Sequence, residues 1–251
     1  ALQNRAETIA KTYAGSITLG TGQFCTNPGL IMGVKSEGLT NFVNILADEI
    51  VKFEPSCMLH PNITAMFDAN KIKATSQAGL EVLAAYENEV KPNFARQVVT
   101  TVEGDTFLNN PTLHHEVFGP FSIVVQCDNE KQLETIISKL EGQLTGTIIS
   151  DENEIKDHTS IIHTLQNRVG RIIFNGVPTG VEVCPSMQHG GPYPASTDSR
   201  FTAVGVDSIK RFVRPFSYQD WPNALLPDEL KDENPLGILR LVNGDKTKNK
   251  I

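Results

Sequence analysis

The segment Gly22–Gly29, GQFCTNPG, carries the residue of this chain that is best suited to nucleophilic chemistry. Its cysteine, Cys25, stands among glycines and amide side chains, which let the backbone and a small molecule approach closely. A thiol in such a loop can be exposed, and it becomes a nucleophile once it loses its proton. The competing interpretation, a small buried hydrophobic residue, applies better to Cys57, Cys127 and Cys184, whose surroundings are not comparable.

A second candidate segment is Glu116–Pro120, EVFGP, which follows the paired histidines His114 and His115. Histidines beside a candidate segment raise the possibility of a Cys–His thiol hydrolase. No third orienting residue and no local signature of that class is recognisable, so this stays a minor alternative. Because no two cysteines have zinc-ligand spacing, we predict no metal site.

The hydrophobic pattern then predicts the elements that must position these segments. It indicates helices at 2–13, 36–53 and 62–78, and strands at 30–34, 80–86 and 97–102. From there it alternates: strand 121–127, helix 129–140, strand 145–150, helix 154–167 and strand 171–175. This order predicts an α/β fold, a mostly parallel sheet with helices on both faces, and the carboxyl ends of its strands are expected to carry the site.

After residue 175 the sequence changes to a long loop rich in Gly, Pro, Ser and Thr that runs to residue 205. Loops of this length are usually functional when they occur in compact domains. A short helix at 207–213, a Pro-rich tail and a strand at 237–242 follow, and that strand has no partner nearby in the sequence. We therefore divide the chain into an α/β domain at 1–205 and an extended tail at 206–251.

Composition excludes several classes of function. The 251 residues carry a net charge of −7 and a pI near 5.4, which argues against binding nucleic acid or anionic membranes. Apolar runs are far shorter than the roughly 20 residues that span a bilayer. Scattered cysteines and the lack of a secretory signal predict a reduced cytoplasmic location. The first helix has no capping residue before it, so we expect it to continue an element that begins elsewhere.

Three segments together resemble the aldehyde dehydrogenase family. GQFCTNPG at 22–29 resembles its nucleophile loop, EVFGP at 116–120 its cofactor-ribose motif, and GRIIFN at 170–175 the strand before its substrate loop. Gly190 and Gly191 fall where the family has paired glycines. The motifs occur in the family's order over about 150 residues, which makes the combination more specific than any single match.

The resemblance implies a role for each matching residue. Cys25 would be the nucleophile, Glu116 would bind the nicotinamide ribose, and Phe118 would border the nicotinamide ring of NADP or NAD. The expected walls of the substrate pocket are Phe24, Thr26, Pro178, Thr179, Gly180 and Val181. FCTNPG, together with residues 192–201 and 218–227, is similar to a branch that oxidises short semialdehydes such as 2,5-dioxopentanoate, commonly with NADP. A pocket for fatty or aromatic aldehydes is the alternative.

The family's dinucleotide-binding domain precedes the first residue of this chain, and no Gly-x-Gly-x-x-Gly loop occurs in it. We therefore expect a catalytic-domain fragment that is inactive alone and binds no cofactor tightly. In the family a strand like 237–242 pairs with a neighbouring subunit, which implies a homo-oligomer. The rival interpretation is a non-catalytic interaction module of the same fold.

Overall fold

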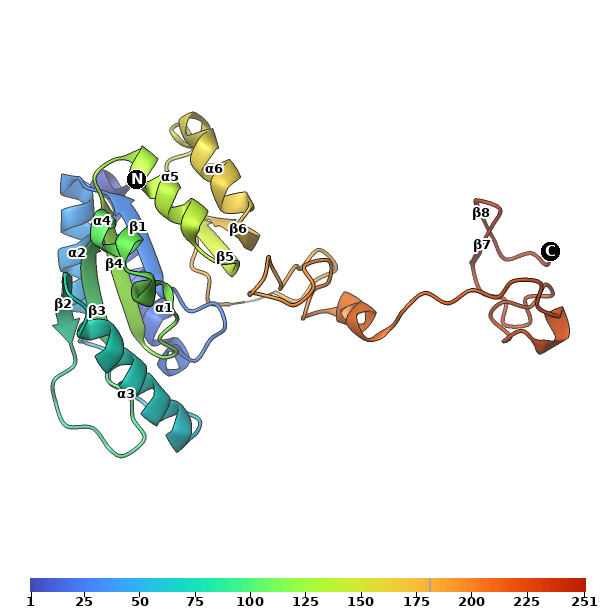
Figure 1. Cartoon of the computed structure of the whole chain (residues 1–251), viewed down its shortest axis with the longest axis horizontal. Helices are drawn as coiled ribbons and strands as arrows, with labels where there is room; N and C mark the ends of the chain where they lie inside the picture. Colours follow the sequence, from blue (N-terminus) through green and yellow to red (C-terminus); the bar gives the residue numbers. More distant parts are fainter. Residues whose placement is uncertain (181) are drawn as a thin grey trace. The chain divides into compact units, whose positions relative to one another are not determined.

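Residues 1–174 form strands and helices that alternate regularly from residue 98 onward (Figure 1). The computed structural model describes residues 1–180 and 182–251. The α-helices are α1 (Leu2–Thr18), α2 (Glu37–Ile50), α3 (Pro61–Thr75), α4 (Gly104–Asn109), α5 (Glu130–Lys139) and α6 (Thr159–Gln166). The strands are β1 (Leu30–Val34), β2 (Leu80–Ala85), β3 (Val98–Glu103), β4 (Phe121–Cys127), β5 (Gln143–Ile148), β6 (Val169–Phe174), β7 (Arg240–Val242) and β8 (Asp245–Thr247). Short 3₁₀ turns are η1 (Leu19–Gly22), η2 (Pro111–His114), η3 (Ile155–His158), η4 (Val206–Phe212) and η5 (Asn223–Leu225).

The central sheet has the strand order β1-β4-β3-β2. Strands β1, β4 and β3 are parallel, and only the edge strand β2 is antiparallel to its neighbour. Val124 of β4 and Val99 of β3 face one side, whereas Ile123 and Val125 of β4 face the other. Because both faces are apolar, the sheet must be covered on both sides.

Helices α1 and α2 cover the first face of the sheet. The Ser36 hydroxyl accepts a hydrogen bond from the Leu39 N–H at 3.2 Å, which satisfies a free donor of the first turn and fixes the start of α2. The rings of Tyr13 and Phe42 meet edge to face, with centroids 6.5 Å apart. This contact joins the buried stripes of the two helices.

Helices α3, α4 and α5 cover the second face (Figure 1). Phe67 of α3, Phe107 of α4 and Ile136 of α5 are almost completely buried against the sheet. The fold class is therefore confirmed: the sheet is mostly parallel and carries helices on both faces, as the alternating pattern predicted.

The predicted succession of strands and helices after residue 121 is also confirmed, but its strands do not form one sheet. Strands β5 and β6 pair in parallel as a separate two-stranded sheet. Helix α6 is shorter than predicted because its first residues form the tighter turn η3. Among the described residues, no helix is long and apolar enough to cross a membrane.

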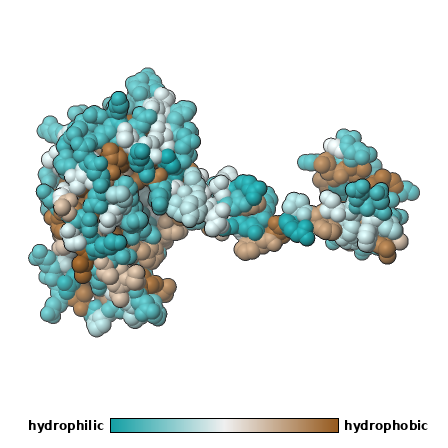
Figure 2. All heavy atoms as spheres, viewed as in Figure 1, coloured by the Kyte–Doolittle hydropathy of each residue, from teal (hydrophilic) through white to brown (hydrophobic). Residues whose placement is uncertain are grey.

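The chain divides into two compact units, Ala1–Arg211 and Phe212–Ile251. In the second unit β7 and β8 form an antiparallel hairpin across Asn243 and Gly244, both with positive φ. The expectation that strand 237–242 lacks a nearby partner is therefore wrong, because Asn-Gly is the dipeptide that favours a tight hairpin turn. No apolar side chain among the described residues of this unit is buried. Figure 2 shows apolar residues at its surface.

Candidate active site

The loop that carries Cys25 runs from the turn η1 to strand β1. It touches the loop before β4: a Cβ added to Gly22 would lie 2.2 Å from the carbonyl carbon of Gly119. The side-chain amide of Asn27 also donates a hydrogen bond to the Gly119 carbonyl at 3.1 Å. Glycine at position 22, with φ of 66°, permits this approach of two backbones. The structure thus brings Cys25 and Glu116–Pro120 into neighbouring loops.

These two loops lie at the amino ends of β1 and β4, which are parallel neighbours. The expectation that carboxyl ends of strands carry the site is therefore wrong for Cys25 and Glu116. Of the three segments at the site, the one after β6 is the only one that follows the carboxyl end of its strand. The two glycines that touch, Gly22 and Gly119, both lie before a strand, so the two segments meet at the amino ends of β1 and β4.

The segment after β6 reaches the cysteine loop through side-chain hydrogen bonds. The hydroxyl of Thr26 donates to the Pro178 carbonyl at 2.7 Å, and the next residue, Thr179, is tied to helix α1, where its hydroxyl lies 2.7 Å from that of Ser16. Thr26 is buried, so its hydroxyl holds the two segments together. Gly180 is exposed, and Val181 lies outside the described residues.

A cavity of about 930 Å³ is lined by several of the predicted site residues. They are Cys25, Thr26, Glu116, Phe118 and Pro178. In the described part of the chain, Phe24, Thr179 and Gly180 are not among the lining residues. The half-buried ring of Phe24 instead lies beside Gly20, where an added Cβ would be 2.8 Å from its Cε2.

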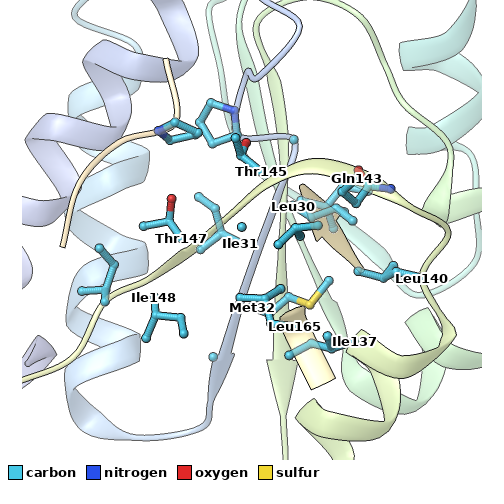
Figure 3. A pocket seen from close by; sticks show the side chains of 18 of the residues that line it. Leu30, Ile31, Met32, Ile137, Leu140, Gln143, Thr145, Thr147, Ile148 and Leu165 are labelled. Atoms are coloured by element: carbon cyan, nitrogen blue, oxygen red, sulfur yellow. The ribbon is translucent and has the colours of Figure 1, made fainter. Parts of the chain in front are cut away.

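The same cavity continues between the central sheet and the β5–β6 sheet. Figure 3 shows side chains of β1 and β5 around it, with Ile137, Leu140 and Leu165 nearby. This part is largely apolar, whereas polar groups gather at the cysteine loop.

Two ionisable groups at the site have shifted pKa values. Partial burial raises the pKa of Glu116, although its side chain retains exposed surface. Burial, and then the positive charge of Arg171, lower the pKa of His189, so its imidazole is neutral at neutral pH.

His189 is the residue that sequence reasoning missed. Its Nε2 lies 3.3 Å from the Sγ of Cys25, although 164 positions separate the two residues. His114, one of the histidines considered in the sequence, is instead hydrogen-bonded through Nε2 to the Phe107 carbonyl at 2.8 Å. The signal available was the pair Gly190–Gly191, which directly follows His189.

The other candidates have ordinary environments. Cys127 is buried, and burial raises its pKa to about 11. Cys57 is exposed, so the expectation that it is buried is wrong. Among the described residues, no three His, Cys, Asp or Glu side chains are grouped to hold a metal ion.

No family model matches this chain. It is 42% identical over 250 residues to an alpha-ketoglutaric semialdehyde dehydrogenase of Acinetobacter baylyi, covering 99% of this chain and 48% of that protein. It is 38% identical over 244 residues to alpha-ketoglutaric semialdehyde dehydrogenase 2 of Azospirillum brasilense, covering 97% and 46%. The chain thus spans about half the length of these curated relatives.

Solved structures show the same fold at low identity. The delta-pyrroline-5-carboxylate dehydrogenase of Mycobacterium tuberculosis matches with a TM-score of 0.65 and 18% identity over 87% of this chain and 43% of that one. Glyceraldehyde-3-phosphate dehydrogenase GapN of Methanocaldococcus jannaschii, complexed with NADP, matches with a TM-score of 0.57 and 17% identity over 72% and 39%.

Proposed function

This chain is related over nearly its whole length to the aldehyde dehydrogenases, and we propose that it supplies the nucleophile-bearing half of an enzyme that oxidises an aldehyde to a carboxylic acid. The observation that carries the proposal is the exposed thiol of Cys25 at a cavity also lined by Glu116 and Phe118. In this proposal residues 1–205 form the catalytic domain and residues 206–251 the assembly tail.

Cys25 performs the covalent steps. Its sulfur gives up its proton and adds to the aldehyde carbon, and the C=O electron pair moves to the oxygen, where the Cys25 backbone N–H is a candidate donor. The carbon then gives up its hydride and becomes a thioester. Water attacks this thioester and the C–S bond breaks. The hydroxyl of the water stays in the acid that leaves, and its other proton restores the Cys25 thiol.

The bound dinucleotide, NADP or NAD, supplies the acceptor for the hydride. The carboxylate of Glu116 can accept hydrogen bonds from ribose hydroxyls, and the ring of Phe118 offers an apolar surface at the same cavity. Since this sequence contains no phosphate-binding glycine motif, we expect the 251-residue chain alone to bind NADP weakly and to be inactive.

The proposed substrate is a short semialdehyde that carries a carboxylate or oxoacid, such as 2,5-dioxopentanoate. The names of the two curated relatives support this class. Of the expected pocket walls, Thr26 and Pro178 line the cavity and are the proposed substrate contacts, whereas Phe24, Thr179 and Gly180 do not line it and Val181 lies outside the described residues. Neutral fatty or aromatic aldehydes are the alternative, because part of the cavity lining is apolar, as at Leu30 and Met32.

We also propose a homo-oligomer assembled through the β7–β8 hairpin and a reducing cytoplasmic location. The exposed apolar side chains of the second unit support assembly, because such surface usually marks a contact with another chain. The location rests on the scattered positions of the four cysteines in the sequence.

The test uses the full-length enzyme that contains this chain. Replacing Cys25→Ser should reduce dinucleotide-dependent aldehyde oxidation by at least about 10⁴-fold while cofactor binding persists, since the covalent step is lost. Retained oxidation would overturn the assignment. In the wild type, kcat/KM for 2,5-dioxopentanoate should exceed that for hexanal and benzaldehyde. The reverse order would overturn the proposed substrate class and leave the assignment of Cys25 in place.

The contact between Cys25 and His189 favours a second candidate, thiol-dependent ester hydrolysis without any dinucleotide. Hydrolysis of p-nitrophenyl acetate by the 251-residue chain distinguishes it. Hydrolysis by the wild-type chain that is lost in Cys25→Ser supports the hydrolase. A wild-type chain that does not hydrolyse the ester is consistent with the dehydrogenase or with a non-catalytic interaction module. Alkylation of Cys25 no faster than that of Cys57 would favour the module.

A further inference from the structure

His189 contacts the sulfur of Cys25 from a buried position. Only 8% of its surface is exposed, while Cys25 itself is exposed, so the imidazole approaches the thiol from the protein side. The Nε2···Sγ distance of 3.3 Å lies within hydrogen-bond range for sulfur. The thiol thus keeps its open side for an incoming electrophile.

The backbone around His189 fixes the position of its ring. Its N–H donates to the Thr202 hydroxyl at 2.9 Å, and its carbonyl accepts from the Ala203 N–H at 2.8 Å. A Cβ added to Gly170 of β6 would lie 2.0 Å from the Gly190 carbonyl oxygen, so the next residue is pressed against this strand. These contacts hold the imidazole in its orientation before the reaction, so little further ordering is needed when the thiol attacks.

The other ring nitrogen, Nδ1, is buried and has no hydrogen-bond partner among the described residues. A carboxylate there would stabilise an imidazolium, but the charged groups found near His189 in the described part of the chain are cations. They are Arg171 of β6, which lowers its pKa, and Arg211, which lines a small cavity with His189. These surroundings disfavour the imidazolium form of His189.

We propose that His189 is a catalytic residue that orients the Cys25 thiol and takes its proton as the sulfur attacks. The inference rests on the proposed function of Cys25 as the nucleophile. In the step, the S–H bond breaks, its electron pair forms the C–S bond, and the proton moves to Nε2. Because Arg171 disfavours the imidazolium, the proton then passes to water and the neutral ring returns.

The test is alkylation of Cys25 by iodoacetamide in the 251-residue chain, followed by peptide mass spectrometry. The sulfur forms a C–S bond, iodide leaves, and the thiol proton goes to the base. Replacing His189→Gln should slow labelling of Cys25 at pH 7 by roughly tenfold or more, since general-base assistance is lost. Labelling of the exposed Cys57 should not change.

A second variant separates chemistry from structure. In His189→Gly, added imidazole should restore labelling of Cys25 in proportion to its concentration, and the neutral form of the imidazole should be the active one over pH 6–8. A merely structural histidine would not give this rescue. Labelling of the buried Cys127 reports unfolding, so a variant that labels there has lost its fold. In that case the labelling rate of Cys25 in the wild type is compared in H₂O and D₂O, and a slower rate in D₂O supports proton transfer to His189.

The outcomes separate the inference from the proposed function. A Cys25 that reacts faster than Cys57 in the wild type but is insensitive to His189→Gln, to imidazole and to D₂O overturns the role of His189 alone. A Cys25 that reacts no faster than Cys57 in the wild type overturns the nucleophile assignment as well.

Discussion

At the scale of single residues, Glu116 combines a proposed binding role with a cost to stability. Burial raises its pKa, so the folded state disfavours the charged carboxylate. The penalty is present above the raised pKa and disappears as the pH falls below the usual glutamate value. Groups arranged for binding often carry such a cost.

We therefore expect Glu116→Gln to stabilise the chain at pH 7–8 and to lose this advantage near pH 4. Because the side chain is partly exposed, the gain is only a few tenths of a kcal/mol. Urea unfolding at several pH values measures it, with the exposed Glu89→Gln as control. In the full-length enzyme the same change should raise the KM for the dinucleotide. Equal stability shifts for both variants at all pH values would contradict the burial argument.

At the scale of elements, the site depends on two loops that touch at Gly22 and Gly119 rather than on any one strand. Each loop precedes a strand of the parallel pair β1–β4, so the sheet sets their spacing. The hydrogen bond of Thr26 to Pro178 then brings in the segment after β6. Displacing either loop should therefore displace the thiol.

Replacing Gly22→Ala tests this dependence. The new Cβ would meet the Gly119 backbone, and the positive φ would be strained, so we expect a loss on the order of 3 kcal/mol and slower labelling of Cys25. Gly29→Ala is the matched control in the same loop, because an added Cβ meets nothing within 4 Å. Its stability should change by less than about 0.5 kcal/mol. Similar losses in both variants would show that loop contact is not the cause.

At the scale of the whole molecule, the second unit has more apolar surface than it can bury by itself. Phe216, Tyr218 and Trp221 form a chain of ring contacts with centroids 5.1 Å and 5.8 Å apart, yet each ring remains exposed. The hairpin β7–β8 adds strand edges that can pair with another chain. Both features favour association.

Truncation after Pro227 removes the hairpin and leaves the aromatic residues in place. We expect the truncated chain to form a smaller assembly than the full 251 residues, because the intermolecular strand pairing is lost. Sedimentation velocity at matched concentrations measures the change. Truncation after Asn249, which retains β7 and β8, is the control. An unchanged assembly size in the first variant would assign the interface to another surface.

Most elements could be predicted from the sequence, and so could the three segments that carry Cys25, Glu116 and Pro178, but not the position of His189. Each such signal is local: the Ser36 cap and its apolar stripe define α2, β-branched runs define β4, and small residues mark the Cys25 loop. Periodicity and capping act within a few turns of chain, so a single window of sequence is enough to read them. The Asn243–Gly244 turn was equally local, and its hairpin was readable although it was not predicted.

Three features could be seen only in the folded structure: His189 meets Cys25, the loops before β1 and β4 touch each other, and β5 and β6 pair apart from the central sheet. These outcomes depend on contacts between residues far apart in the chain. No local propensity encodes them, because each contact is set by how all the helices and strands pack at once and by which loops can close.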